Sequence, residues 1–386
     1  METKKLYYED CHLQKFTALV KNCEKTDKGW EVILDATAFY PEGGGQACDL
    51  GELGWSEVLD VRERGEEVIH LCSAPLPIGE DVEGSVDWDR RRDLMQQHTG
   101  EHIVSGIIHR AFGWHNVGFH MGAETVTIDF DGPIPEAALA EIQRQANEAV
   151  WQDLEVKCWY PSEEELPHVG YRSKKELPWP VRVVEVPGYD KCACCGVHTA
   201  RTGEIGLIKL LSCVKFHQGV RIEMVCGERA LAFLNKVYEQ NRQISQLFSA
   251  KLLETAQAAE QINRQLNEAK YQIARLQKRI FATVAEGYAG KGNVLHIEPD
   301  LEPGDVRKLA DAIADACGGI GAAASGSDDL GYSLCIVSKT GDVRELGKRA
   351  FGALNGRGGG KPASVQGSVK ATEKEIRAFF EGEFAK

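Results

Sequence analysis

Two pairs of side chains, far apart in the sequence, have the types and the spacing of metal ligands. His98 and His102 lie four residues apart in QQHTGEHIVSG, a stretch whose apolar residues recur at helical spacing. Residues four apart on a helix share one face, with Cβ atoms roughly 5–6 Å apart, so two imidazoles there can hold one ion. Cys194 and His198 have the same separation in CCGVH, where Gly196 indicates a turn. Together the two pairs supply three nitrogens and one sulfur, a donor set that suits tetrahedral zinc.

Each pair also has an ordinary explanation. The two histidines fit a solvated helix surface, and the cysteines fit a buried core beside a surface histidine. Cys192 and Cys195 are further thiols in the same segment, and the residues alone do not choose between them and Cys194. Because both pairs fall within one inferred domain, we favour joint metal binding.

The segment HTGEH also fits the pattern H-x-x-E-H, in which the glutamate is the general base of a metallopeptidase. Five residues with two unspecified positions are a weak signal, and this interpretation leaves the Cys–His pair unexplained. Glu101 is also our candidate for orienting a catalytic water. On an ideal helix, however, it faces a different direction from His98 and His102.

Two glycine-rich segments are candidates for contact with a phosphate-containing ligand. In PEGGGQ, three glycines would let the backbone approach a ligand where any Cβ would intrude, and the amide of Gln46 could donate to a phosphate or ribose oxygen. In NGRGGGKP, backbone N–H groups and two cations suit a phosphate backbone, although a flexible connector would look the same. The candidate residues are Gly43, Gly44, Gly45, Gln46, Arg357, Gly358, Gly359, Gly360 and Lys361.

The elements that must position these residues fall into four regions of an α+β protein. We expect a β-rich, barrel-like domain over residues 1–88 and an α+β, metal-containing core over 89–226. One long helix follows over 227–286, with neither Pro nor Gly between residue 228 and about residue 284, and a small α/β domain follows over 287–386. The long helix carries a heptad seam, so either two chains pair here as a coiled coil or the helix packs within the chain. The seam residues are Ala259, Ile262, Leu266, Ala269, Ile273, Leu276 and Ile280.

The composition is that of an ordinary soluble protein. Of its 386 residues, 43% are apolar and 27% are charged, and no signal peptide or apolar run near 20 residues is present, which predicts a cytoplasmic protein without a membrane span. Twelve cysteines at irregular spacing favour reduced thiols or metal ligands over a disulfide scaffold. The net charge of −13 argues against a general nucleic-acid coat but permits local basic patches. We read the run Arg90, Arg91 and Arg92 as a solvated charged face.

The motifs together resemble a known family. HTGEH, followed about 90 residues later by CCGVH and TGEIG, resembles the editing domain of alanyl-tRNA synthetase, and is most similar to the free-standing alanyl-tRNA editing proteins of the AlaX type. FYPEGGGQACDLG resembles the glycine-rich motif of the domain that precedes this core. GRGGGKPASVQGS resembles the signature of the DHH-associated C-terminal domain. The order of the parts is the same, and the resemblance covers nearly the whole chain.

The resemblance implies an activity and a set of site residues. It assigns the zinc ligands to His98, His102, Cys194 and His198, and it implies hydrolysis of the ester that joins a wrong amino acid to alanine tRNA. Serine is the first expected amino acid and glycine the second, with alanine spared. His120 is our candidate for recognising the hydroxyl group. Where the synthetase often has Gly-Gly-Thr between the cysteine and the histidine, this chain has CGV, which leaves the ligand spacing unchanged.

The resemblance also implies partners. The segment from Arg357 to Lys361 would bind the tRNA body, and the long helix or the C-terminal domain would form a homodimer. Because the chain starts at the β-rich domain, without an aminoacylation domain, we expect the long form of the free-standing editor. The alternatives from other classes are a metallopeptidase of H-x-x-E-H type and an RNA-binding protein in which zinc is only structural.

Overall fold

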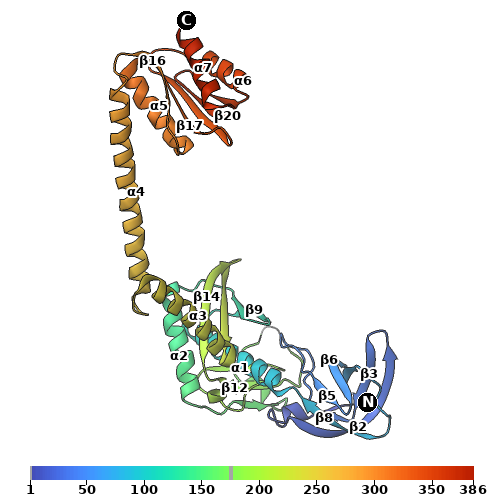
Figure 1. The fold of residues 1–386 in the computed structure, drawn as a ribbon. Coiled ribbons are helices and arrows are strands. Elements are labelled where there is room, and N and C mark those ends of the chain that lie inside the picture. Colours follow the sequence, from blue (N-terminus) through green and yellow to red (C-terminus); the bar gives the residue numbers. More distant parts are fainter. Residues whose placement is uncertain (1, 174–176) are drawn as a thin grey trace. The chain divides into compact units, whose positions relative to one another are not determined.

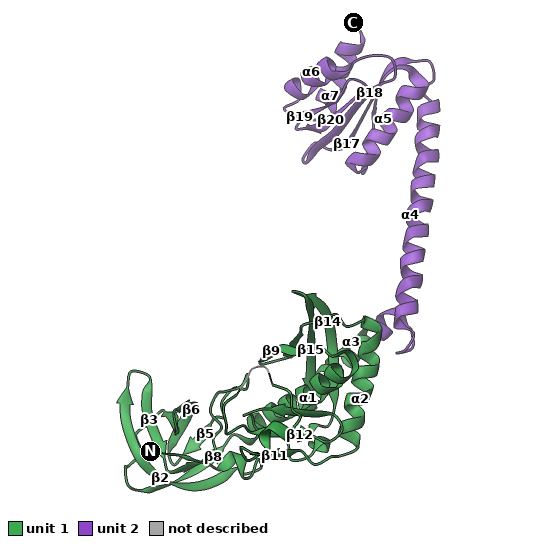
Figure 2. Ribbon diagram, turned by 180° about the vertical axis from the view of Figure 1, so that it is seen from behind, with its two compact units in different colours: residues 1–243 green, residues 244–386 purple. Residues whose placement is uncertain are grey.

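The computed structural model describes residues 2–173 and 177–386 of the chain (Figure 1). The chain divides into two compact units, residues 1–243 and residues 244–386 (Figure 2). The fold is a mixture of helices and antiparallel and parallel sheets, which confirms the α+β class. Among the described residues, no helix has both the length and the apolar character needed to cross a lipid bilayer.

The first unit begins with a closed six-stranded barrel, whose order is β2-β3-β7-β6-β5-β8. Its strands are β2 (Lys15–Thr26), β3 (Gly29–Leu34), β5 (Gly51–Leu53), β6 (Ser56–Arg64), β7 (Glu67–Cys72) and β8 (Asp81–Val86). A short parallel pair, β1 (Lys4–Lys5) and β4 (Ala36–Thr37), lies outside the barrel order. Alternate side chains of β6 and β8 are buried, as expected for strands with one face toward an apolar interior.

Helix α1 (Trp88–Phe112) is the central element of the rest of this unit (Figure 1). Asp87 caps its N-terminus by accepting from the backbone N–H of Arg90, and Gly113 ends it at a φ of +75°. The residues from Leu94 to Ile108 are all buried, so α1 is surrounded by protein instead of presenting one face to water. The helix that the spacing in QQHTGEHIVSG predicts is confirmed.

Two sheets and a second helix enclose α1. The four-stranded sheet has the order β14-β15-β10-β9 and the three-stranded sheet the order β11-β12-β13, all antiparallel. The elements are β9 (Asn116–Met121), β10 (Val126–Phe130), α2 (Leu139–Trp151), β11 (Lys157–Trp159), β12 (Val183–Val186), β13 (Asp190–Ala193), β14 (Ile208–Phe216) and β15 (Gly219–Cys226). Short 3-10 turns lie at Leu6–Tyr8, Glu136–Ala138, Leu166–His168 and Thr202–Ile205.

The predicted single helix over residues 227–286 is wrong in one respect, because it is two helices. Helix α3 (Gly227–Phe248) ends at Ser249, and α4 (Thr255–Glu286) begins after a six-residue break. Ser249 has a φ of +50°, the backbone N–H of Ala250 donates to the carbonyl of Ser245, and the Ser245 hydroxyl donates to the carbonyl of Ala250. This is a left-handed helix ending of the kind that glycine usually provides. The heptad seam lies wholly on α4, where its large side chains are about half exposed in the single chain.

The second unit holds a five-stranded sheet of order β16-β17-β18-β20-β19 with α5, α6 and α7 (Figure 2). Strands β16 and β17 are parallel and are joined through α5, whereas the other neighbours are antiparallel. The elements are β16 (Gly292–Ile297), α5 (Pro303–Cys317), β17 (Gly318–Ser327), β18 (Gly331–Ser338), α6 (Arg344–Ala353), β19 (Arg357–Lys361), β20 (Ser364–Val369) and α7 (Glu373–Phe384). The glycine run is therefore an edge strand, not the flexible connector that we kept as its alternative.

Candidate metal centre

The four predicted ligands come together in the first unit. His98 and His102 project from α1, and Cys194 and His198 lie just after β13; one ligand atom from each lies within 4.8 Å of all the others. The Sγ of Cys194 is 3.4 Å from Nε2 of His98 and 3.4 Å from Nε2 of His198. A tetrahedral zinc with sulfur at about 2.3 Å and nitrogen at about 2.0 Å places such atoms about 3.5 Å apart. The arrangement therefore fits a zinc ion.

The electrostatics of this group also suit a cation. Burial raises the pKa of the Cys194 thiol, but the rings of His98, His198 and His102 outweigh burial and hold that pKa well below its ordinary value. Burial together with the neighbouring His98 lowers the pKa of His198 to about 3. A thiolate and a neutral imidazole are the forms that bind metal, so these two residues are held in the binding state.

His102 is oriented by a buried ion pair. Its Nδ1 lies 3.0 Å from Oδ2 of Asp190, and Arg172 donates to both oxygens of that carboxylate, at 2.7 and 2.9 Å. Burial raises the pKa of Asp190, but the hydrogen bonds from His102 and Arg172 outweigh it and lower that pKa. An ionised Asp190 accepts the Nδ1–H of His102, which leaves Nε2 free for a metal.

His198 is oriented by Thr99, the residue after His98 on α1. The Nδ1 of His198 lies 3.2 Å from Oγ1 of Thr99, and the backbone N–H of Thr199 donates to the same oxygen at 3.1 Å. A hydroxyl oxygen can accept both bonds, so Thr99 again leaves Nε2 of the histidine facing Cys194.

His98 is oriented by Gln46, which lies in the glycine loop between β4 and β5. Its Nδ1 lies 2.8 Å from Oε1 of Gln46, and the backbone N–H of Val197 donates to the same oxygen at 3.2 Å. A Cβ at Gly196 would lie on the imidazole of His98 and 2.9 Å from that oxygen, so the glycine of CCGVH is needed for this packing. Gln46 therefore joins the PEGGGQ loop to the metal centre.

The loop that carries Cys194 is held by Arg182. This guanidinium donates to the carbonyls of Cys194 and Gly196, at 2.9 and 2.8 Å, and it lies 4.5 Å from the ring centroid of Tyr8. The backbone N–H of Gly196 donates to the sulfur of Cys194 at 3.3 Å, as expected for a thiolate acceptor.

The neighbouring cysteines are not in the four-ligand group. Burial raises the pKa of Cys192 to about 11, and its sulfur belongs to a different cluster, with His102 and Asp190. Cys195 is exposed and lies outside the four-ligand group. The geometry therefore favours Cys194 among the three thiols.

A cavity of about 740 Å³ lies beside the metal centre. Its lining includes every residue that the sequence suggested for substrate contact, together with Arg62 and Glu63 from strand β6 of the barrel. These predicted residues are Gly43, Gly44, Gly45, Gln46 and His120. His120 is exposed on β9, whereas Gln46 is 1% exposed.

One glycine of the loop has a packing role that we did not expect. Gly45 has a φ of +86°, and a Cβ there would lie 2.6 Å from the ring of Phe119. That ring stacks on His98 with a centroid distance of 5.2 Å and an interplanar angle of 27°. Gly45 therefore lets the loop pack against Phe119 beside His98. The same lack of a Cβ would let a ligand approach the backbone.

Glu101 does not join the ligand group. It is buried, and its Oε1 accepts hydrogen bonds from the hydroxyl of Ser105 and from the amide of Asn116. This position does not suit the water-orienting role that we considered for Glu101, and it does not suit the H-x-x-E-H interpretation.

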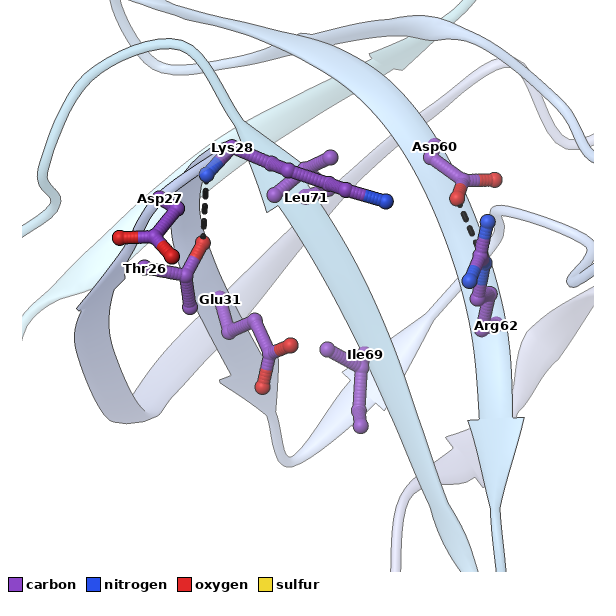
Figure 3. A pocket seen from close by; sticks show the side chains of 8 residues that line it. All are labelled: Thr26, Asp27, Lys28, Glu31, Asp60, Arg62, Ile69 and Leu71. Carbon is purple, nitrogen blue, oxygen red and sulfur yellow. Dashed lines mark hydrogen bonds and ion pairs between the residues drawn. The ribbon is translucent and has the colours of Figure 1, made fainter.

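A second hollow, of about 350 Å³, lies on the barrel (Figure 3). Arg62 lines both this hollow and the 740 Å³ cavity. Its Nε lies 2.6 Å from Oδ2 of Asp60. The backbone N–H of Lys28 donates to the hydroxyl of Thr26 at 3.2 Å. The lining has neither cysteine nor histidine, so it offers no thiolate or imidazole ligand for a soft metal ion.

In the second unit, the predicted RNA-contacting segment is the exposed strand β19. A Cβ at Gly358 would collide with the ring of Phe351, and one at Gly360 with the carbonyl of Ser364. A Cβ at Gly359 would meet no other atom within 4 Å. Packing within the sheet therefore explains two of the three glycines. Arg357 and Lys361 flank them with exposed cations.

Several residues that position the ligands are not indicated by any sequence pattern. Asp190, Arg172, Thr99, Arg182 and Phe119 act on the ligands through contacts that only the fold creates. The only local signal was the position of Asp190, four residues before Cys194 in YDKCAC.

Comparisons with known proteins point to one group. Residues 1–90 match the family model of tRNA synthetases class II (A), and residues 181–223 match that of the threonyl and alanyl tRNA synthetase second additional domain. The chain is 30% identical over 396 residues to the alanine–tRNA ligase of Pyrococcus abyssi, covering 98% of this chain and 43% of that protein. It is 32% identical over 403 residues to that of Pyrobaculum neutrophilum, covering 97% and 44%.

The chain thus spans less than half the length of these curated relatives. Among solved structures, the C-Ala domain from Aquifex aeolicus alanyl-tRNA synthetase matches with 25% identity and a TM-score of 0.20, covering 23% of this chain and 89% of that one.

Proposed function

The chain is related to the alanyl-tRNA synthetases over nearly its whole length, and from this premise we propose that it is a zinc-dependent hydrolase that removes a wrong amino acid from alanine tRNA. The observation that carries the proposal is the convergence of three histidines and one cysteine beside the cavity formed by the glycine loop. We propose serine as the main substrate and glycine as the second, with alanine spared.

The physical need for such an activity is clear. A synthetase pocket that accepts alanine rejects the smaller glycine weakly, because a missing methyl group changes the binding free energy little. It also rejects an added hydroxyl imperfectly, so serine is attached to alanine tRNA at times. A second site that hydrolyses the wrong ester corrects both errors.

The proposed reaction is hydrolysis of the ester at the 3′ end of the tRNA. The oxygen of a water molecule bonds to the carbonyl carbon, the bond to the ribose oxygen breaks, and a proton passes to that oxygen. A zinc ion held by His98, His102, Cys194 and His198 would supply Lewis acidity for the carbonyl or the water. The cavity has the size of small-molecule sites and can hold the acyl group with the terminal nucleoside. His120, at its wall, is the proposed contact for the serine hydroxyl.

We propose that the second unit binds the tRNA body through β19. Its exposed Arg357 and Lys361 suit phosphate oxygens, and the three glycines between them leave the outer edge of the strand uncovered by side chains. The half-exposed seam of α4 is the proposed contact with a second copy of the chain. We propose further that the 386-residue chain acts in trans on tRNA released in the cytoplasm.

The test is deacylation by the purified 386-residue chain. Alanine tRNA charged with serine, glycine or alanine would be incubated with the unchanged protein, with Cys194→Ala, and with Cys213→Ala as a matched loss of a thiol outside the ligand group. We expect rapid loss of serine or glycine, retention of alanine, no activity in Cys194→Ala and full activity in Cys213→Ala.

If a folded, zinc-loaded protein leaves all three esters intact, the editing proposal is wrong. Retained tRNA binding would then favour an RNA-binding protein with structural zinc. The peptidase alternative has less support, since Glu101 is engaged by Ser105 and Asn116.

A further inference from the structure

Gln46 has one amide atom that the site described so far leaves unexplained. The side chain is 1% exposed, and its Oε1 accepts two hydrogen bonds, from His98 and from Val197. Its Nε2 has no partner anywhere in the described part of the chain and is shielded from solvent. A buried amide N–H without an acceptor is costly, so a donor of this kind calls for a water or ligand oxygen beside it.

The orientation of this amide follows from its partners. The backbone N–H of Val197 can only donate, so the atom 3.2 Å from it must be the oxygen of Gln46. Nε2 of His98 faces the sulfur of Cys194, so Nδ1 carries the hydrogen that Gln46 accepts. Nε2 of Gln46 is then left on the other branch of the amide with two hydrogens to donate.

The surroundings hold the amide in this place. Gln46 lines the 740 Å³ cavity together with His120. The absence of a Cβ at Gly196 makes room for the bonded pair of Gln46 and His98. The loop that carries Gly196 thus contacts the amide of Gln46, although it lies far in the sequence from the glycine loop that carries Gln46.

We propose that Gln46 serves the metal centre and the substrate with opposite ends of one amide. Oε1 holds His98 in the tautomer whose Nε2 is free for zinc, and Nε2 donates to the carbonyl oxygen of the aminoacyl ester. This inference rests on the proposed function and deepens it by assigning the donor that recognises the ester group.

The chemistry of ester hydrolysis gives this donor a purpose. When the water oxygen bonds to the carbonyl carbon, the π electron pair of the carbonyl moves onto its oxygen, which becomes negative. A fixed N–H group close to that oxygen stabilises the charge more than it stabilises the neutral ester. The electron pair then re-forms the carbonyl as the bond to the ribose oxygen breaks, and that oxygen takes the proton from the water.

Two substitutions separate the two ends of the amide. Gln46→Glu keeps an oxygen acceptor for His98 but has no N–H donor, whereas Gln46→Leu has neither. Zinc affinity would be measured by competition with a chromogenic chelator, and kcat and KM by deacylation of seryl-tRNA. Gln143→Leu is the matched control, because Gln143 also accepts from a backbone N–H, that of Leu210, outside the metal centre.

We expect Gln46→Glu to bind zinc nearly as well as the unchanged protein but to lose kcat by a factor on the order of 100. Gln46→Leu should lose zinc affinity by about 10–100-fold as well as kcat. Gln143→Leu should retain both quantities, and thermal unfolding would establish that each variant is folded.

The two halves of the proposal fail separately. Full kcat in Gln46→Glu would overturn the donor role, and unchanged zinc affinity in Gln46→Leu would overturn the role in holding His98. If the unchanged protein hydrolyses none of the charged tRNAs, the proposed function and the donor role both fail. The zinc titrations would still decide the role of Oε1.

Discussion

At the scale of single residues, the metal centre is defined by the partners of its histidines. Each Nδ1 is engaged by a different kind of group: the amide of Gln46, the carboxylate of Asp190 and the hydroxyl of Thr99. These contacts fix the ring orientations before a metal binds. Such partners raise metal affinity because the ligands need little reorganisation.

Replacing Asp190 with Asn should weaken zinc binding. The neutral amide oxygen accepts the N–H of His102 less strongly than a carboxylate, and it no longer pairs with Arg172. We expect a loss of about 10–100-fold in zinc affinity, measured by chelator competition.

The control for this experiment is Asp129→Asn. Asp129 accepts two hydrogen bonds from Arg221 in the neighbouring strand, at 2.6 and 2.8 Å. The substitution therefore removes a similar ion pair outside the metal centre. Equal zinc affinities in both variants and the unchanged protein would show that Asp190 does not tune the site.

Among the helices and strands, α1 is connected to the barrel by a buried ion pair. Arg91 donates to both oxygens of Asp49, and both side chains are fully buried. Arg91 also donates to the carbonyls of Cys11 and Ala38. The pair connects the start of α1 to the segment that follows the glycine loop, so it helps to place Gln46 beside His98.

Arg91→Met should therefore destabilise the first unit. The substitution leaves the carboxylate of Asp49 buried without its partner, which typically costs about 3–5 kcal/mol. Urea unfolding at pH 7.5 measures this loss. Arg144→Met is the comparison, since Arg144 pairs with Glu141 and Glu148 on the exposed face of α2, and its loss should have little effect. Equal losses in the free energy of unfolding of the two variants would show that the Arg91–Asp49 pair does not stabilise the first unit.

A buried histidine in the barrel predicts a pH dependence. Burial lowers the pKa of His70 to about 4; its Nδ1 donates to the carbonyl of Val32, and the hydroxyl of Thr37 lies 2.8 Å from its Nε2. Between pH 6.5 and 4 the unfolded chain therefore binds more protons at this residue than the folded chain. The stability that His70 contributes is complete above pH 6.5 and falls as the pH is lowered through this window.

From pH 7.5 to pH 5.0, His70 should account for a loss of about 2 kcal/mol in the free energy of unfolding. Urea unfolding with a chelator present, for the unchanged protein and for His70→Asn, would measure the difference. If both proteins lose the same stability over this range, His70 is not the group that titrates.

The elements also show what the sequence could predict. The pairs His98–His102 and Cys194–His198 were visible because each is a local spacing. The bond from Gln46 to His98 joins residues 52 positions apart, and that from His102 to Asp190 joins residues 88 apart, so only the fold reveals them. The run from Arg90 to Arg92 predicts a solvated face, but Arg91 is buried, because its partner Asp49 lies 42 positions away in the sequence. The sequence does not indicate the break at Ser249, because a serine occupies the left-handed position that glycine usually marks.

For the whole molecule, the two units have separate cores, and all four candidate ligands lie in the first. Calorimetry of the full chain should therefore show two transitions, of which zinc raises only one. At a zinc concentration 100 times the dissociation constant, the stabilisation is about 2.7 kcal/mol. Cys194→Ala should abolish the shift, whereas an equal shift of both transitions would show that the units unfold together.

The edge strand of the second unit has a further consequence, for solubility. An open edge presents unpaired backbone groups to any other extended chain and invites growth into a larger sheet. In β19 that edge is made of three glycines between Arg357 and Lys361. Glycine is a poor strand former and offers no side chain to pack, while like charges at both ends repel a second copy of the strand. The residues proposed to lie along an RNA backbone are thus also suited to keeping this protein from aggregating.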